Sequence, residues 1–149
     1  MSLKKQNINL IIIILTLSFS LGVNAEELKN IGKFKDWETL MLINETEKVC
    51  FAQSKPVLQS PKKNIRDARL FVSFRPNDKI VDEVSTTSGY EYNSQNSITA
   101  KSGKSKYKFD ISQEKFAWIA DSKIEKKMIK KMKKASRIMV TGYNQSGSQ

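Results

Sequence analysis

The sequence contains no histidine and only one cysteine, Cys50. Without histidine the chain lacks the commonest general base of enzymes and the commonest metal ligand. A closed zinc site is therefore all but excluded, and we expect no cofactor. One cysteine cannot form a disulfide within its own chain, so we expect Cys50 to be a small buried residue on a strand. The alternative is an intermolecular disulfide, which an oxidising compartment would permit.

Acidic residues are scarce relative to basic ones. The 149 residues include 26 Lys and Arg against 15 Asp and Glu, which gives a net charge of +11. Such a balance draws a protein towards nucleic acid, acidic lipid or acidic glycan. The length and the hydrophobic share of 39% fit one globular domain rather than two.

Long apolar runs are absent except at the N-terminus. Lys4 and Lys5 precede an apolar run over residues 8–21, and small residues follow up to Ala25. This pattern predicts a secretory signal peptide over residues 1–25, cleaved after Ala25. A membrane anchor is the alternative, but the run is shorter than the roughly 20 apolar residues of a membrane span, so we expect no transmembrane segment in the mature chain. Cleavage lowers the net charge to +9 and implies a periplasmic or secreted protein.

Export narrows the choice of partner. A protein carried across the inner membrane does not meet nucleic acid, so we expect no nucleic-acid binding. An anionic membrane surface, an acidic glycan or an unidentified acidic protein remains as the partner class.

The rest of the chain has mostly strand patterns. The clearest is residues 66–76, where Leu70, Val72 and Phe74 share one side of an extended segment. We expect this strand inside a sheet, ended by Pro76, with Arg75 paired to Asp82 or Glu83. Further strands are predicted over residues 37–43, 48–54, 80–87, 97–101, 106–111, 116–119 and 136–143.

These strands predict one mainly β domain over residues 36–143, an antiparallel sandwich with a helix packed on it. Residues 26–35 are expected to be a polar, mobile leader, and residues 144–149 a frayed polar tail.

The one helix is predicted over residues 123–135. Ser122 and Glu125 have capping-box spacing, and Ile124, Met128 and Met132 lie on one side. This apolar stripe indicates docking on the sheet; the alternative is a helix that lies on an anionic membrane. If the stripe faces inward, the remaining lysines form a candidate surface for an anionic partner: Lys126, Lys127, Lys130, Lys131, Lys133 and Lys134.

No catalytic or metal-binding residues are predicted, so we expect no enzyme. A hydrolase would need a convergent carboxylate pair or a Ser-Lys pair. The acidic candidates have no spacing that singles out two of them and suit solvated positions: Asp36, Asp67, Asp82, Glu83 and Asp110. Ser102 with Lys104 suits a turn, and Ser136 near Lys134 suits a helix end.

Several segments, taken in order, resemble the invasion-associated locus B family over roughly residues 34–147: Asp36-Trp37, Lys48 to Ser54 (KVCFAQS), Arg69 to Pro76 (RLFVSFRP), Glu83-Val84-Ser85 with Gly89-Tyr90, Ala117-Trp118 and Met132-Lys133-Lys134. That family comprises exported proteins of alphaproteobacteria, named for a member linked to host-cell entry. The resemblance implies an immunoglobulin-like β-sandwich and a non-enzymatic binding or envelope protein with a role in host-cell or surface interaction. It offers no catalytic residues. An assembly or chaperone-like module that pairs through an exposed strand edge is the alternative function.

Overall fold

The computed structural model describes residues 27–44 and 46–149. The predicted signal peptide, with its cleavage point after Ala25, lies outside these residues. The described part is mainly β, with antiparallel sheets and one α-helix, as the strand patterns predict. Its elements are β1 (Glu27–Phe34), β2 (Trp37–Ile43), β3 (Lys48–Ser54), β4 (Arg69–Arg75), β5 (Ile80–Thr87), β6 (Ile98–Ser102), β7 (Ser105–Phe109), β8 (Ile111–Gln113), β9 (Phe116–Trp118), α1 (Ser122–Met132) and β10 (Met139–Thr141).

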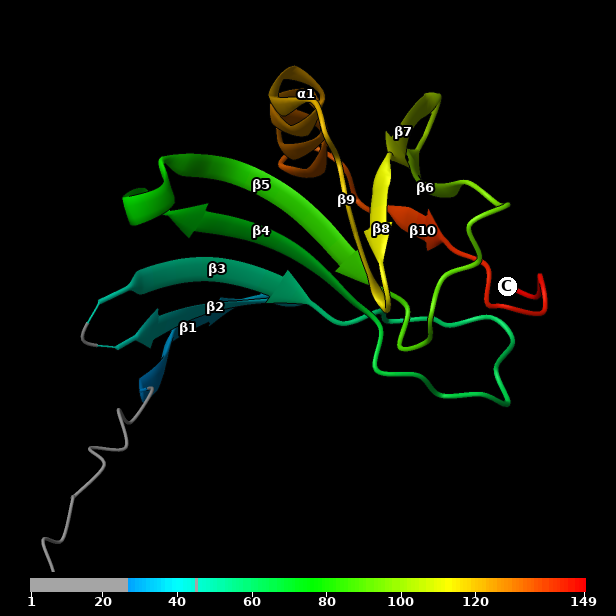
Figure 1. Cartoon of the computed structure of the whole chain (residues 1–149), viewed down its shortest axis with the longest axis horizontal. Helices are drawn as coiled ribbons and strands as arrows, with labels where there is room; N and C mark the ends of the chain where they lie inside the picture. The colour runs from blue at the N-terminus through cyan, green and yellow to red at the C-terminus, as the bar shows by residue number, and fades with distance from the viewer. Residues whose placement is uncertain (1–26, 45) are drawn as a thin grey trace, which may run out of the picture.

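The strands form two sheets that face one another in a sandwich-like arrangement (Figure 1). The larger sheet has the order β1-β2-β3-β4-β5-β9-β8, and the smaller has the order β10-β6-β7. The strand predicted to be interior, β4, is the middle strand of the larger sheet. Pro76 ends it, as expected, and opens a short 3₁₀ turn before β5.

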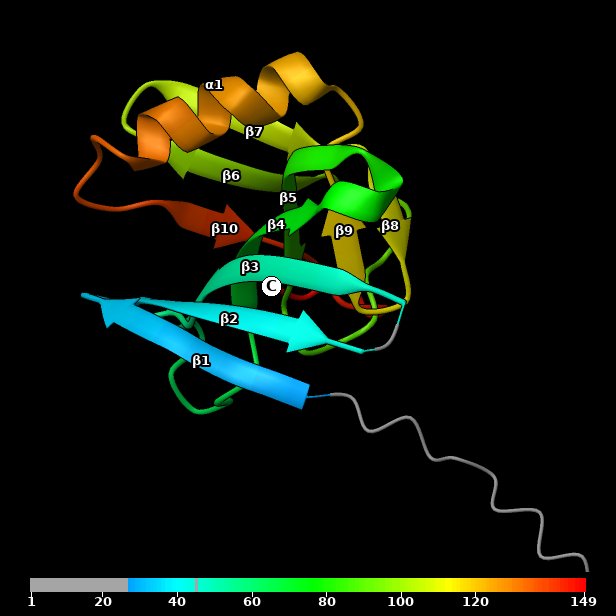
Figure 2. The same ribbon diagram turned by 90° about the vertical axis from the view of Figure 1, so that its left-hand side faces the viewer.

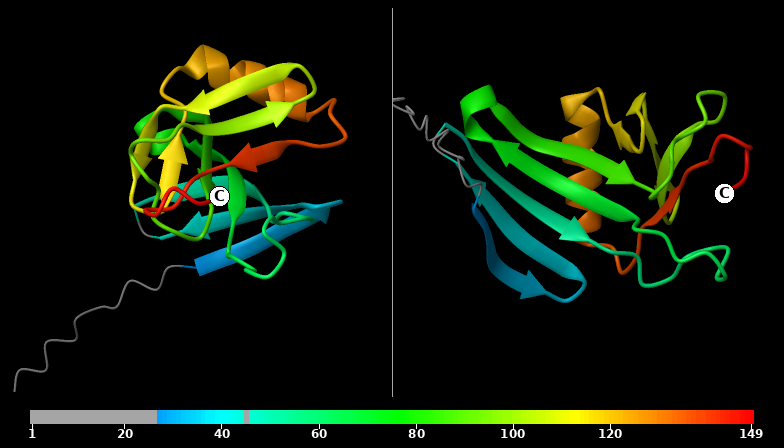
Figure 3. Two further views of the ribbon diagram at one scale, coloured as in Figure 1. Left: turned by 90° about the vertical axis from the view of Figure 1, so that its right-hand side faces the viewer. Right: turned by 60° about the horizontal axis from the view of Figure 1, so that its bottom comes forward.

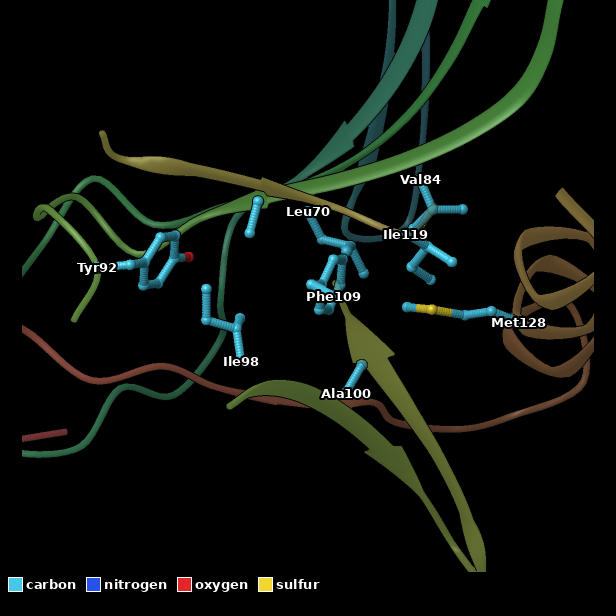
Figure 4. Close-up of a cluster of buried hydrophobic side chains, with 9 residues drawn as sticks. Leu70, Val84, Tyr92, Ile98, Ala100, Phe109, Ile119 and Met128 are labelled. Atoms are coloured by element: carbon cyan, nitrogen blue, oxygen red, sulfur yellow. The ribbon is translucent and has the colours of Figure 1, made fainter. Parts of the chain in front are cut away.

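The core lies between the larger sheet, the smaller sheet and α1 (Figure 4). Each layer contributes side chains that are almost fully buried: Leu70, Val84, Ala117 and Ile119 from the larger sheet and its continuation, Ile98, Ala100 and Phe109 from the smaller sheet, Met128 from α1, and Tyr92 from the connection. Because α1 closes the side of the sandwich, the predicted docking of its apolar stripe is confirmed.

The apolar face predicted for β4 is only partly buried. Leu70 and Val72 are buried, whereas Phe74 is 37% exposed. The register of β4 against β5 shifts between Ser73 and Arg75, which leaves Phe74 out of the ladder. The core cluster reaches Leu70 but not Phe74, so the second layer covers only one end of the strand.

Arg75 is paired with a carboxylate, as predicted. Its Nη1 and Nη2 atoms donate to the two carboxylate oxygens of Glu83, each at 2.8 Å, and its Nε donates to Asp78 at 3.1 Å. These bonds to Glu83 and Asp78 raise the pKa of Arg75. The bidentate contact fixes the β4–β5 register beside the bulge, so Arg75 belongs to the scaffold.

Three segments of the described chain differ from their predictions. Residues 27–34 form β1, paired with β2, although all eight of its residues are exposed. Because backbone pairing needs no apolar pattern, this strand has no recognisable pattern in the sequence. The tail is not frayed, because Gln145 donates to the carbonyl of Tyr92 at 2.9 Å and the amide of Asn144 bonds to Ser148. The second hairpin ends at Phe109, and Ile111 lies in the other sheet, 51% exposed.

The helix begins differently from the prediction. Asp121, rather than Ser122, is the N-cap residue, and its Oδ1 accepts a hydrogen bond from the amide of Lys123 at 2.7 Å. The helix ends at Met132, three residues before the predicted end. Glu125 does not complete a capping box, because its side chain turns inward to the sheet.

Candidate functional site

Half of the basic residues of the described chain lie in one layer, where they have almost no acidic residues among them. We define the basic layer as residues 98–109, which form the β6–β7 hairpin, together with residues 122–137, which form α1 and the start of its connection to β10 (Figure 2). This layer contains a single acidic residue, Glu125. Its twelve basic residues are Lys101, Lys104, Lys106, Lys108, Lys123, Lys126, Lys127, Lys130, Lys131, Lys133, Lys134 and Arg137.

The rest of the described chain has no net charge. Outside the basic layer, the described residues include twelve Lys and Arg and twelve Asp and Glu. The net positive charge of the folded domain therefore belongs to one layer rather than to the whole surface. This segregation places a positive potential on one side of the molecule.

The alternation along the hairpin turns its lysines outward. Ile98, Ala100 and Phe109 enter the core, whereas Lys101 and Lys106 are cross-strand partners on the opposite face of the small sheet. The candidate surface predicted from the sequence covers only the helix lysines. The alternation of lysines with other residues over residues 101–108 is the sequence signal that extends this surface to the hairpin.

The helix presents its lysines in the same way. Met128 is fully buried beneath α1, and five of the six lysines named from the sequence are exposed: Lys126, Lys127, Lys130, Lys133 and Lys134. The sixth, Lys131, is half-buried, and its Nζ lies 4.0 Å from where a Cβ on Gly103 would stand. The helix surface therefore continues onto the tip of the hairpin.

Almost all of these charges lack an acidic neighbour. Within residues 27–44 and 46–149, the ion pair that involves the basic layer joins Lys108 to Asp110 at 3.8 Å, and it is exposed. The other cations of the layer have no carboxylate within 4 Å among the described residues. Their charge is available to an external anion.

Glu125 is the one acidic residue of the layer, and its predicted role in a capping box is wrong. Only 7% of it is exposed, and its Oε1 accepts a hydrogen bond from the amide of Val84 at 2.8 Å. Burial raises the pKa of Glu125, the bond from Val84 partly opposes this rise, and the charges of Glu83, Asp82 and Asp121 add to it. Glu125 therefore ties α1 to β5 at Val84, just beyond the residues of β5 that pair with β9, at an electrostatic cost.

A depression of about 500 Å³ lies beside Glu125. Glu83 and Glu125 both line it, together with Arg75 and apolar side chains that include Trp118 and Ile119. Two carboxylates thus converge on one concavity, which a hydrolase of the carboxylate-pair type would need. Glu83, however, is held by both nitrogens of Arg75, so the depression offers one carboxylate that is not neutralised.

The other carboxylate candidates lie apart from this depression. Asp36 is an exposed turn residue, and Asp110 contacts Lys108. Asp67 is also exposed, and its bond to Arg69 lowers its pKa. Asp82 is a bulge residue of β5 with a φ of 65°. Within the described ranges, no three acidic or cysteine side chains are placed to hold a metal ion.

The two Ser-Lys candidates occupy the positions expected of a turn and a helix end. Ser102 is buried, and its Oγ donates to the carbonyl of Arg137 at 3.0 Å, while Lys104 is exposed in the hairpin turn. Ser136 and Lys134 are exposed after the end of α1.

Cys50 lies on β3, as predicted, between Met41 of β2 and Phe74 of β4. It is free and half-buried rather than fully buried. Its strand is the third of the larger sheet, so a partner thiol would have to approach over a sheet face and not along an edge.

No helix in the described part of the chain has the length and apolar character needed to cross a bilayer. Comparison with known proteins gave no match, whether to family profiles, to curated sequences or to solved structures. The resemblance to the invasion-associated locus B family therefore rests on the sequence segments that carry it.

Proposed function

We propose that this protein is an exported, non-enzymatic binding or envelope protein of the invasion-associated locus B type, with an immunoglobulin-like sandwich, located in the periplasm or secreted. Its partner is anionic, and the basic layer is the contact surface. The observation that carries this proposal is the segregation of charge, with twelve basic residues against the single, buried carboxylate of Glu125. A uniformly basic surface would bind anions without a preferred orientation, whereas this one has a binding side.

An acidic glycan fits the basic layer better than a bilayer does. Stable docking on a membrane combines lysines with apolar side chains that enter the acyl region. The large exposed apolar side chains of the described chain all lie outside the basic layer. A flexible polyanion needs no such insertion and can follow both the helix and the hairpin.

Reversing three exposed helix charges tests the surface. The variant Lys127→Glu, Lys130→Glu, Lys134→Glu is expected to lower affinity for heparin, as a model acidic glycan, by at least tenfold, since a lysine near an anionic surface contributes about 1 kcal/mol. A second variant with Lys101→Glu, Lys106→Glu and Lys108→Glu should show a comparable loss. Titration calorimetry at low and high salt measures both, and affinity should fall as salt rises.

The matched control reverses the same number of charges elsewhere. Lys33, Lys48 and Lys115 are exposed and lie outside the basic layer. Their triple change to Glu should leave heparin affinity within about threefold, because it alters net charge equally but not the basic layer. Equal losses in the control and helix variants would show that net charge, and not this surface, governs binding. Vesicles with and without phosphatidylglycerol form a second arm that tests the membrane as the partner.

The free edge of β1 favours an assembly module as a second candidate function. β1 is the outermost strand of the larger sheet in both views of Figure 3, and it exposes Leu28, Ile31 and Phe34. A long exposed edge strand is a template for pairing with another chain. On this alternative the protein should self-associate or recover an envelope partner after crosslinking, and Ile31→Pro should abolish this by blocking the ladder. A monodisperse monomer with no recovered partner would count against it.

A further inference from the structure

The loop between β3 and β4, residues 55–68, exposes apolar side chains more fully than any other part of the described chain. Ile65 is 90% exposed, Leu58 83% and Val57 75%. These are the three most exposed large apolar side chains of the described residues, and all three lie in this one loop. A single exposed leucine needs no explanation, but such a group indicates a contact surface.

The loop is nevertheless held in a defined shape. The side chain of Gln59 donates to the carbonyl of Arg66 at 2.9 Å and accepts from its amide at 3.1 Å. Arg66 in turn donates to the carbonyl of Ser60 at 2.7 Å and stacks over the ring of Tyr90 at 5.4 Å. Because the loop is already ordered, presenting its apolar side chains to a partner costs little further conformational entropy.

The base of the loop is packed against Gly89. A Cβ on this residue would stand 3.0 Å from the amide nitrogen of Asp67 and 3.2 Å from the Cβ of Arg66, and its φ of +78° also favours glycine. The close approach anchors the loop to the connection that follows β5. The exposed apolar side chains are thus carried by a loop that is fixed in place.

The charges around these side chains are mainly positive. Lys55, Lys62 and Lys63 are exposed in the same loop, and its one acidic residue, Asp67, is paired with Arg69 at 2.9 Å. Aliphatic tips surrounded by lysines are the combination that holds a protein at an anionic bilayer, through apolar insertion and attraction to headgroups. The Gln59 bonds also satisfy both backbone groups of Arg66, so these would not be stranded in an apolar environment.

We propose that residues 55–68 dock this protein on an anionic lipid bilayer, with Val57, Leu58 and Ile65 entering the apolar region. The loop and α1 lie at opposite ends of the molecule in Figures 1 and 2. Docking through the loop therefore leaves the basic layer pointing away from the bilayer. A loop that docks in the groove of a partner protein would be expected to carry aromatic anchors that fit the groove, and this loop has no aromatic residue.

The test uses the full chain with Cys50→Ser and one new cysteine, Leu58→Cys or Lys104→Cys, labelled with an environment-sensitive fluorophore. Vesicles contain phosphatidylglycerol and a phosphatidylcholine brominated in its acyl chains. The label at residue 58 is expected to be quenched at least threefold, and the label at residue 104 to remain bright. If the apolar run at residues 8–21 or the basic layer held the protein on the vesicle instead, the label at residue 58 would not be quenched more than the label at residue 104.

Unlabelled variants give an independent measurement. Val57→Ser, Leu58→Ser, Ile65→Ser removes the exposed tips and should lower partitioning into these vesicles at least tenfold. The control, Leu28→Ser, Ile31→Ser, Phe34→Ser, removes a similar apolar area from β1 and should not. Quenching that is equal at residues 58 and 104, or equal losses in the two triple variants, would overturn the proposal. Recovery of a protein through the loop, without quenching at residue 58, would overturn it as well.

Discussion

Met128→Ala is expected to lower the free energy of unfolding by about 2–5 kcal/mol, the largest effect of any single change considered. Met128 is fully buried and is the side chain through which α1 enters the core. Truncation removes its dispersion contacts and leaves a cavity between the helix and the two sheets, where Val84 and Ile119 face it (Figure 4). Urea unfolding followed by circular dichroism measures the loss.

Met139→Ala is the matched control for this change. Met139 lies on β10 and is 56% exposed, so the same truncation should alter stability by no more than about 0.5 kcal/mol. The Met128 variant should also retain heparin affinity at temperatures where it is folded, because the lysines of the helix are unchanged. A Met128→Ala protein as stable as the Met139→Ala protein would show that α1 is not anchored in the core.

Two substitutions of Glu125 are expected to separate the effect of its hydrogen bond on stability from the effect of its charge. Glu125→Ala removes the acceptor of the buried Val84 amide and should cost about 1–3 kcal/mol. Glu125→Gln keeps an acceptor oxygen but removes the buried charge and its repulsion from Glu83, Asp82 and Asp121. We therefore expect the Gln variant to be at least as stable as the parent protein at neutral pH.

The pH dependence gives the sign of the charge effect. The folded pKa of Glu125 is above its unfolded value, so the folded state holds the proton more tightly. Ionisation then costs stability as pH rises from the ordinary carboxyl range through the raised pKa, and this cost is absent below the unfolded pKa. Relative to Glu125→Gln, the parent protein should therefore lose stability over that window.

Urea unfolding of both proteins at a series of pH values measures this difference, with Glu91→Gln as the control at an exposed site. Subtracting the two curves cancels the other titrating groups. A difference between parent and Glu125→Gln that does not change with pH would contradict a raised pKa.

Much of the fold could be predicted because its strands alternate and its turns are polar. The β2–β3 and β4–β5 pairs, the interior place of β4 and the pairing of Arg75 all follow from local patterns. β1 could not be predicted, because a strand that buries no side chain leaves no periodic pattern. The exposure of Phe74 depends on how far the second layer extends, which no local segment encodes.

Only the helix part of the candidate surface could be predicted from the sequence. The six helix lysines lie close together in the sequence and are therefore easy to recognise. The hairpin lysines join them only through the fold, which brings the hairpin tip at Gly103 next to Lys131. Glu125 was misassigned because Ser122 and Glu125 have the spacing of a capping box, and Asp121 takes the capping role. Long-range contacts, such as the bond from Val84 across 41 residues, lie beyond any spacing rule.

The placement of the net charge in one layer also gives the molecule a permanent electric dipole. In the field near an acidic glycan, the partner proposed for the basic layer, the protein would rotate before contact, so that α1 and the β6–β7 hairpin arrive first. Productive encounters would then exceed those of a protein that carries the same charge spread evenly. Salt would slow this capture by shortening the distance over which the molecule is turned.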